Sequence, residues 1–178
     1  MVNTLLKTGE LGIFALGGLG EVGKNMYIYD IHDRIYIVDS GILFPDEHLL
    51  GIDYVIPDFT YLVENEDRIV GLFVTHAHED HIGAIAHLWP KLECNIFATP
   101  FTAVLIKEKF KEKHIDITKH LKIVQLNGTI DLDPFKIEYI TLTHSILEPN
   151  GLRIETPAGV ILHTGDWKID PEPLIGGK

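Results

Sequence analysis

The sequence has little of three things that would place it in a specialised class of protein. Its single cysteine, Cys94, cannot form a disulfide within the chain, which excludes a cysteine-rich zinc module and fits a reducing cytosol. No apolar run approaches the roughly 20 residues of a transmembrane helix. Basic residues are few, with 15 Lys and Arg against 26 Asp and Glu. What remains, 178 residues of which 46% are hydrophobic, is enough for one globular domain with its own core.

The net charge of −11 bears on the choice of partner. Taken alone, it argues against a nucleic acid, because a surface that binds phosphate backbones is usually basic. Divalent cations held by carboxylates and histidines can reverse the sign of the charge locally. The net charge therefore does not decide between nucleic acids and other substrates.

Short apolar segments alternate with helical ones, which predicts a layered α/β fold in a single domain, residues 1–178. The expected strands are Ile13–Leu16, Met26–Asp30, Arg34–Val38, Ile69–Val74, Asn95–Ala98, Leu121–Gln125, Phe135–Leu142, Gly151–Glu155 and Val160–His163. The expected helices are Phe59–Val63, Ile82–Trp89, which Pro90 should end, and Phe101–Lys113, which follows Pro100.

The run Thr75-His76-Ala77-His78-Glu79-Asp80-His81 carries the strongest chemical signal. It directly follows an apolar strand, so a turn there can direct several side chains to one point. His76 and His78 lie two apart and can face the same side, where neutral imidazoles suit zinc or manganese. Asp80 and His81 can then reach a second ion. The alternative, a surface loop that is merely rich in histidine, is weaker because the run follows a buried type of strand.

Three further candidates follow predicted strands, namely Asp39, His144 and Asp166. Each alone is more often a turn residue, but loops at one edge of a sheet can converge on one site. A carboxylate such as Asp166 can bridge two ions about 3.5–4 Å apart. His163 should point away from its neighbour Thr164 on an alternating strand, so we expect it beside the ligands and not among them.

The glycine-rich segment Gly17–Asn25 matches G-x-G-x-x-G and, except at its last position, a P-loop. Both motifs require a helix after the loop, whereas Met26–Asp30 is of β type. We therefore reject nucleotide binding and expect a tight connection between strands at the edge of the site. Backbone N–H groups there can touch a phosphate, and the candidate residues are Gly20, Glu21, Lys24 and Asn25.

Asp39, the histidine-rich run, His144 and Asp166 together resemble, in order, the first four motifs of the metallo-β-lactamase superfamily. Three longer stretches, Phe14–Asn25, Leu50–Asp58 and His163–Lys168, resemble the ribonuclease J family of bacteria. The resemblance covers nearly the whole chain. It implies an αββα metallo-β-lactamase sandwich with metal ions at one edge, of which this chain would be an incomplete, N-terminal portion.

The same resemblance implies a role for each candidate. The site would hold two divalent ions, for which the donor types indicate zinc, with manganese as the alternative. One ion would be bound by His76, His78 and His144, and the second by Asp80 and His81. Asp166 would bridge the two ions, and Asp39 would support the site from behind. Asp80, His81 and Asp166 would be the catalytic residues around a hydroxide that attacks RNA.

Members of that family cut RNA endonucleolytically and also degrade it in the 5′ to 3′ direction, in mRNA turnover and rRNA maturation. The resemblance thus implies RNA as the partner, no membrane, a cytoplasmic location and a homo-oligomer in the full-length form.

Family members are longer, because a β-CASP domain interrupts their β-lactamase domain and a last metal-binding histidine follows. We therefore expect residues 1–178 to be an N-terminal portion that binds the first ion better than the second and has weak ribonuclease activity, or none, alone. One alternative is a small hydrolase of thioesters or lactams, which would need a closing histidine that does not follow His163. Another is a non-catalytic metal-binding module.

Overall fold

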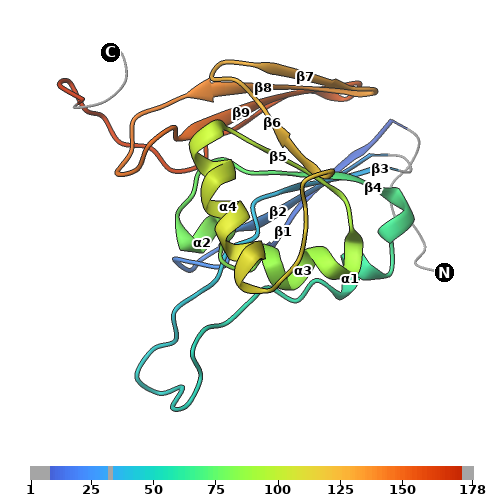
Figure 1. Ribbon diagram of the computed structural model, residues 1–178. Coiled ribbons are helices and arrows are strands. Elements are labelled where there is room, and N and C mark those ends of the chain that lie inside the picture. The colour runs from blue at the N-terminus through green and yellow to red at the C-terminus, as the bar shows by residue number, and fades with distance from the viewer. Residues whose placement is uncertain (1–8, 32–33, 174–178) are drawn as a thin grey trace.

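The computed structural model describes residues 9–31 and 34–173, which form three layers (Figure 1). A six-stranded sheet lies in the middle, helices cover one of its faces, and a four-stranded sheet packs on the other. The strands of the first sheet are β1 (Leu11–Gly17), β2 (Met26–Ile31), β3 (Arg34–Val38), β4 (Ile69–Phe73), β5 (Asn95–Ala98) and β6 (Leu121–Ile123). The second sheet contains β7 (Thr129–Leu132), β8 (Phe135–Thr141), β9 (Asn150–Thr156) and β10 (Gly159–His163).

The order of strands follows from the connections between them. In the first sheet β1, β2 and β3 pair antiparallel, and β3 to β6 run parallel to one another. Parallel neighbours need a crossover, and the helical segments supply it. These are α1 (Thr60–Val63), η1 (Glu66–Arg68), α2 (Glu79–Ile82), α3 (Ile85–Leu92) and α4 (Pro100–Glu112). The second sheet is an antiparallel meander in the spatial order β10-β9-β8-β7.

The side chains of the middle sheet alternate between two cores, as the two-residue period of a strand requires. Ile28 and Ile37 face the helices, where they join residues of α3 and α4. Tyr29 and Tyr36 face the second sheet and join Phe135 and its neighbours. Each fully buried Ile, Leu or Phe stabilises the fold by about 1.5–3 kcal/mol. Both faces of the middle sheet are thus buried, one against the helices and the other against the second sheet.

Two tyrosines also fasten the sheets together through their hydroxyl groups. The Tyr36 hydroxyl donates to the Leu132 carbonyl over 2.8 Å, and the Tyr139 hydroxyl donates to the Phe97 carbonyl over 2.9 Å. The rings of Tyr36 and Phe135 stack with centroids 3.7 Å apart. These bonds satisfy buried polar groups and fix one sheet relative to the other.

The structure contains every predicted strand, with ends within two residues of those expected, but it departs from the sequence predictions in two places. β7 was not predicted, because its half-exposed sequence Thr-Ile-Asp-Leu carries little apolar signal. The helix expected at Ile82–Trp89 is divided into α2 and α3, and Pro90 lies inside α3. Proline removes only its own N–H bond, and the Glu93 N–H still bonds to the Trp89 carbonyl over 2.8 Å. The prediction that Pro90 ends the helix is therefore wrong.

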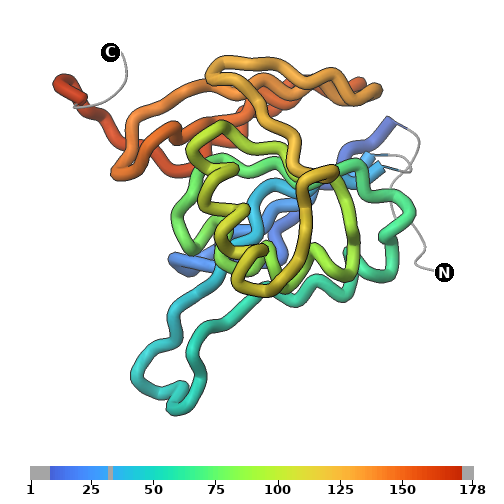
Figure 2. The backbone as a smooth tube through the Cα atoms, viewed as in Figure 1, coloured from blue at the N-terminus to red at the C-terminus, as the bar shows by residue number. Residues whose placement is uncertain are grey.

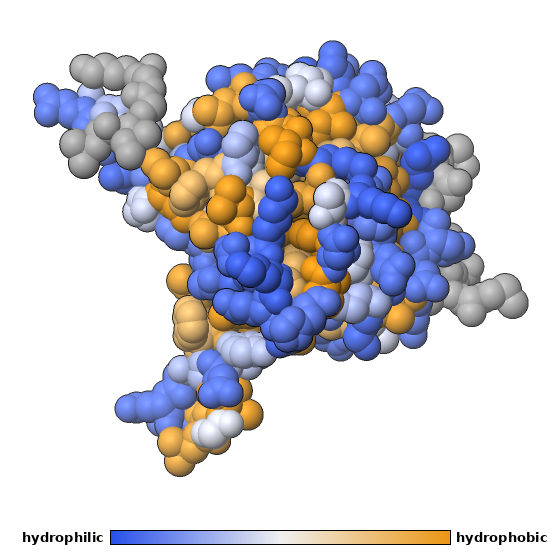
Figure 3. All heavy atoms as spheres, viewed as in Figure 1, coloured by the Kyte–Doolittle hydropathy of each residue, from blue (hydrophilic) through white to orange (hydrophobic). Residues whose placement is uncertain are grey.

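The connection from β3 to α1 forms an arm, residues 44–56, that projects from the body of the molecule (Figure 2). Leu43 and Val55 pair at its base. Its surface mixes hydrophobic and hydrophilic residues (Figure 3), and Leu50 is 89% exposed. α4, at 13 residues, is the longest helix described, and none of the described helices has the length and hydrophobicity of a membrane span.

The packing around α3 predicts that the thiol of Cys94 reacts slowly in the native protein. Burial raises the pKa of Cys94 to about 12 from an ordinary 9.0, so its thiolate fraction at pH 8 should fall by about a thousandfold. We expect Ellman's reagent to react very slowly with the native protein and to titrate one thiol per chain in guanidinium. Rapid titration of the native protein would show that the α3–β5 packing is wrong.

Candidate metal centre

The candidate site lies where several strands end at one edge of the two sheets. β3 and β4 run parallel, so the residues after them, Asp39 and Thr75, leave the middle sheet at the same edge. The Asn150 backbone N–H, at the start of β9, donates to the Thr75 carbonyl over 3.1 Å and brings the second sheet to this edge. β8 and β10 both pair antiparallel with β9 and therefore also end there. The topology thus collects the loops that carry the predicted ligands.

Asp39 is a completely buried carboxylate that organises this edge. One oxygen, Oδ1, accepts from the Thr75 backbone N–H over 2.8 Å. The other, Oδ2, accepts from the Thr75 hydroxyl and lies 2.8 Å from Nδ1 of His81. With Nδ1 bonded to a carboxylate, His81 presents Nε2 as its ligand atom toward Asp80 and Asp166. Asp39 therefore lies behind His81, on the side of the ring away from Nε2.

The loop after β3 and the helix α2 approach each other unusually closely. The Ser40 N–H donates to the His81 carbonyl over 2.7 Å, and the Ile42 N–H donates to the Glu79 carbonyl over 3.0 Å. A Cβ on Gly41 would lie 1.5 Å from the Asp80 carbonyl oxygen, so only glycine fits at this position. This backbone contact fixes α2, and with it Asp80 and His81, against Asp39.

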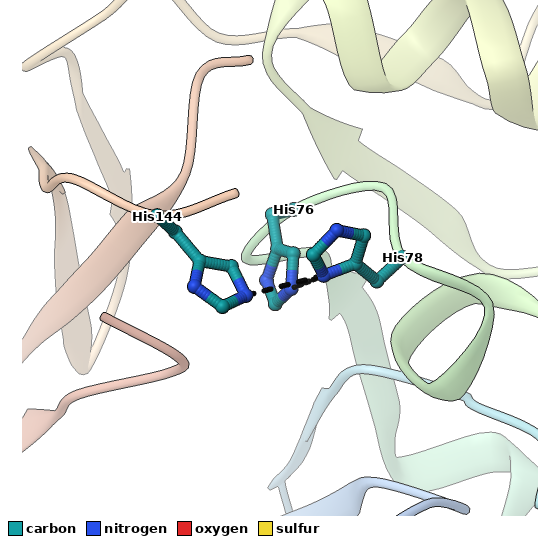
Figure 4. A group of neighbouring side chains, drawn as sticks. All are labelled: His76, His78 and His144. Carbon is teal, nitrogen blue, oxygen red and sulfur yellow. Dashed lines mark hydrogen bonds between the residues drawn. The ribbon is translucent and has the colours of Figure 1, made fainter. Parts of the chain in front are cut away.

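The imidazoles of His76, His78 and His144 converge from two separate loops (Figure 4). His78 Nδ1 lies 3.1 Å from His76 Nε2 and 3.2 Å from His144 Nε2. The Thr75 hydroxyl is 3.0 Å from His76 Nδ1, which leaves Nε2 of His76 directed at the other rings. Three ring nitrogens that face one another in this way suit three of the four positions of a tetrahedral metal site.

A second group of possible ligands consists of His76, His81 and Asp166. Asp166 Oδ2 lies 3.5 Å from His81 Nε2 and 3.7 Å from His144 Nε2, so this carboxylate stands between the two groups. Asp80 belongs to neither compact group, but its Oδ2 is 3.6 Å from His81 Nε2. His76 is common to both groups, whereas the resemblance implied that it binds the first ion alone.

The charges at the site are strongly coupled. Burial disfavours the charged form of His81, but the carboxylates of Asp39, Asp166 and Asp80 outweigh it and raise the pKa of His81 to about 10. Contact with His81 lowers the pKa of Asp166 to about 2. Burial, helped by the positive charge on His81, lowers the pKa of His76 to about 3. Asp166 is thus ionised at neutral pH and His76 is neutral, which is the state that a metal ligand needs, whereas His81 must release its proton to bind an ion.

The donor set fits a divalent cation. Imidazole nitrogens and carboxylate oxygens are ligands for zinc and manganese, and the atoms of each group all lie within 4.8 Å of one another. Facing imidazole nitrogens gain little from one another, since at most one proton can be shared between each pair. A cation at their centre would satisfy all of them at once.

The glycine-rich loop reaches this site through a single side chain. β2 follows the loop, so the predicted strand-to-strand connection is present. The Asn25 amide nitrogen lies 3.2 Å from Asp80 Oδ2 and 3.1 Å from His81 Nε2. Lys24 forms an ion pair with Glu21 over 3.2 Å, and Gly20 is exposed with open space around it. Among the described residues, Asn25 is the one of the four candidates for substrate contact whose side chain contacts the proposed ligands.

Three residues have supporting positions that the sequence signalled weakly or not at all. Thr75 bonds to Asp39 and to His76 and accepts two bonds from Asn150 on its carbonyl. Asn150 is fully buried and stands alone in the sequence without a motif. His163 lies beside the ligands as expected, with its Nδ1 2.9 Å from the Tyr29 hydroxyl.

Comparison with protein families gives a match over residues 19–174 to the model described as the metallo-beta-lactamase superfamily. Among solved structures, the metallo-beta-lactamase fold protein YhfI from Bacillus subtilis superposes with a TM-score of 0.58 at 17% identity, covering 86% of this chain and 61% of that one. The likeness to YhfI concerns the fold alone.

Two curated relatives are more similar in sequence. Ribonuclease J 1 of Streptococcus pyogenes serotype M3 is 45% identical over 98% of this chain. Ribonuclease J of Helicobacter pylori is 44% identical over 91% of this chain. The chain spans 31% of the length of the first and 24% of the length of the second.

The shared position of His76 generates a prediction about metal affinity. His76→Ala removes a donor from both ligand groups, so it should weaken zinc binding by more than about a hundredfold, since even the loss of an outer partner costs 10- to 100-fold. Isothermal titration of the metal-free chain measures this. His48→Ala, in the exposed arm, is the matched control and should bind zinc like the parent chain. Equal affinity of both variants would contradict the assigned ligands.

The buried hydrogen bonds of Asp39 predict that its substitution lowers the stability of the fold as well as the affinity for zinc. Asp39→Asn places an amide NH₂ against the His81 and Thr75 donors, so we expect a loss of about 3–5 kcal/mol in the free energy of unfolding of the metal-free chain. Zinc affinity should also fall about 10- to 100-fold. Urea unfolding and zinc titration check both effects. Asp53→Asn, which is exposed, should change neither, and an unaltered Asp39→Asn protein would refute this role.

Proposed function

The chain belongs to the metallo-β-lactamase superfamily, and we propose that it provides the metal-binding part of a ribonuclease that hydrolyses RNA phosphodiester bonds. The observation that carries the proposal is the convergence of His76, His78, His144, His81 and Asp166 at one edge of the sandwich. Identities of 45% and 44% to proteins named ribonuclease J support RNA as the substrate.

The residues present fit two divalent ions, for which we propose zinc, with manganese as an acceptable substitute. His76, His78 and His144 would hold the first ion, Asp80 and His81 would hold the second, and Asp166 would contact both. Such ions supply a nucleophilic hydroxide at neutral pH and neutralise charge on the phosphate oxygens. With Asp166 the proposed first set has four ligands and the second has three, so we expect the first ion to bind more tightly.

The protein's own contribution is to fix these groups before the substrate arrives. Asp39 and Thr75 hold His81 and His76 in one orientation each, and both supports are buried. The Asp166 side chain is 44% exposed, so the carboxylate between the two ligand groups is open to a substrate from solvent. Asp80, His81 and Asp166 are therefore the residues that we propose to face the reacting phosphate.

The loop before β2 offers the substrate contacts of the proposal. Asn25 lies against Asp80 and His81, and Lys24 precedes it with a side chain that is 20% exposed. We assign Lys24 and Asn25 to the phosphate next to the scissile bond. Gly20 and Glu21 shape the loop, since Glu21 accepts from the Gly18 N–H over 3.2 Å and pairs with Lys24.

The activity of the complete protein is also part of the proposal. We propose endonucleolytic and 5′ to 3′ exonucleolytic cleavage of RNA in the cytoplasm, in RNA turnover and rRNA maturation, by a homo-oligomer. The net charge of −11 is compatible with this, because bound cations reverse the sign of the charge where the phosphate approaches.

Substrate choice tests the proposal directly. The complete product of the gene that encodes this chain, supplied with zinc or manganese, should hydrolyse 5′-labelled RNA and leave a thioester and a β-lactam intact. Asp80→Asn should lower the rate on RNA by about a hundredfold or more, because a ligand beside the reacting phosphate is lost. Asp67→Asn, an exposed residue of η1, should keep the parental rate. Thioester or lactam turnover with intact RNA would overturn the proposal.

A further inference from the structure

The second sheet delivers His144 on a loop, residues 142–149, which connects β8 to β9. The ring of the candidate ligand His81 is oriented by Asp39, which lies behind it. Among the described residues the His144 ring has no such partner, because its hydrogen-bond and ring contacts are with other candidate ligands, such as His78 at 3.2 Å from Nε2. The direction of His144 therefore depends on how its loop is held.

Glu148 fastens this loop to helix α4. Its Oε2 accepts from the Phe101 backbone N–H over 2.8 Å. The first N–H groups of a helix have no partner within the helix, and Thr99, at the N-cap position, makes no side-chain capping bond. The Thr99 hydroxyl donates instead to the Thr102 hydroxyl over 3.2 Å. Glu148, 47 positions further along the chain than Phe101, thus takes the place of the usual N-cap side chain.

The backbone at Glu148 is held in an unusual conformation. Its φ of 53° is in the left-handed region, which residues with a Cβ adopt infrequently. The Glu148 carbonyl accepts from the Asn150 side-chain amide over 2.7 Å, and the same amide donates to the Thr75 carbonyl over 3.1 Å. A conformation of this kind persists where the surrounding structure determines it. The loop is thus fixed at Glu148 through both its backbone and its carboxylate.

The bond to α4 joins the second sheet to the layer that carries the other two histidines of the first ligand group. β4 and β5 run parallel, so α4, which follows β5, begins at the same edge as the run that contains His76 and His78. His144 and Glu148 belong instead to the connection between two strands of the second sheet. The bond between Phe101 and Glu148 therefore links the two layers beside the metal edge.

From these contacts we infer that Glu148 is a positioning residue, which acts through its loop to keep the His144 ring directed at His76 and His78. The inference rests on the metal-binding part of the proposed function. Without the carboxylate the loop loses its bond to α4, and His144 gains freedom that metal binding must then remove. Groups that orient a ligand from outside contribute about 10- to 100-fold to metal affinity. Glu148 acts through the loop and not on the ring itself, so we expect the lower end of that range.

Cobalt(II) tests this inference, because it accepts the same nitrogen and oxygen ligands as zinc and absorbs visible light most strongly when it is four-coordinate. In the complete product of the gene that encodes this chain, Glu148→Ala should lower the affinity for the first cobalt ion about tenfold and weaken the visible absorption of the bound ion. Exchange of the Phe101 amide hydrogen should become faster. An unchanged affinity and spectrum would overturn the inference.

Three further variants separate positioning from stability. Glu148→Gln keeps an oxygen that can accept from the Phe101 N–H, so it should restore cobalt binding close to the parental affinity and spectrum. Glu148→Gly removes the carboxylate but suits the left-handed backbone, so it should bind cobalt as weakly as Glu148→Ala without straining the loop. Glu93→Ala makes the same exchange at an exposed residue whose φ is 45°, and it should behave like the parent protein.

The same titrations distinguish failure of this inference from failure of the proposed function. If the parent binds cobalt but Glu148→Gly binds it equally well, or Glu148→Gln loses as much affinity as Glu148→Ala, Glu148 does not position His144 and the metal site stands. If the parent binds no cobalt, or if His144→Ala leaves the spectrum unchanged, the proposed metal site is refuted, and the inference with it.

Discussion

The bonds made by the buried carboxylate of Asp39 are the constraint on which the metal edge depends. This group ends β3, accepts two bonds from Thr75 at the end of β4 and orients His81 on α2. A buried charge is costly unless it is fully bonded, so the three elements are held together by the need to satisfy it. The positions of the other ligands follow, because His76 is bonded to the same Thr75 and Gly41 brings the Asp80 backbone against the loop after Asp39.

The second sheet supplies the candidate ligands that the first sheet lacks. Asn150 joins β9 to the Thr75 carbonyl, and the loops after β8 and β10 then deliver His144 and Asp166 to the same edge. Neither half of the molecule holds a full set of ligands. Sandwich packing is therefore what brings the two groups of candidate ligands together, and the tyrosine bonds between the sheets hold this edge as well as the core.

The sequence predicted which side chains converge at the metal edge better than it predicted the residues that hold them there. The histidine-rich run and the residues at strand ends could be recognised because their chemistry is concentrated at short spacings or repeated after each strand. Asn150 gave no signal, since its role depends on a contact with Thr75 across 75 positions of the chain. β7 and the continuation of α3 past Pro90 were missed for a similar reason, because packing and pairing with distant residues outweighed weak local preferences.

Anomalous diffraction from crystals grown with zinc is the most direct test of the central claim that this edge is built to hold metal ions. The account predicts one strong peak among His76 Nε2, His78 Nδ1 and His144 Nε2, and a weaker peak beside His81 Nε2 and Asp166 Oδ2. It also predicts that Asp39 remains bonded to His81 and makes no contact with either ion. Zinc bound elsewhere on the chain, or bound directly by Asp39, would contradict the account.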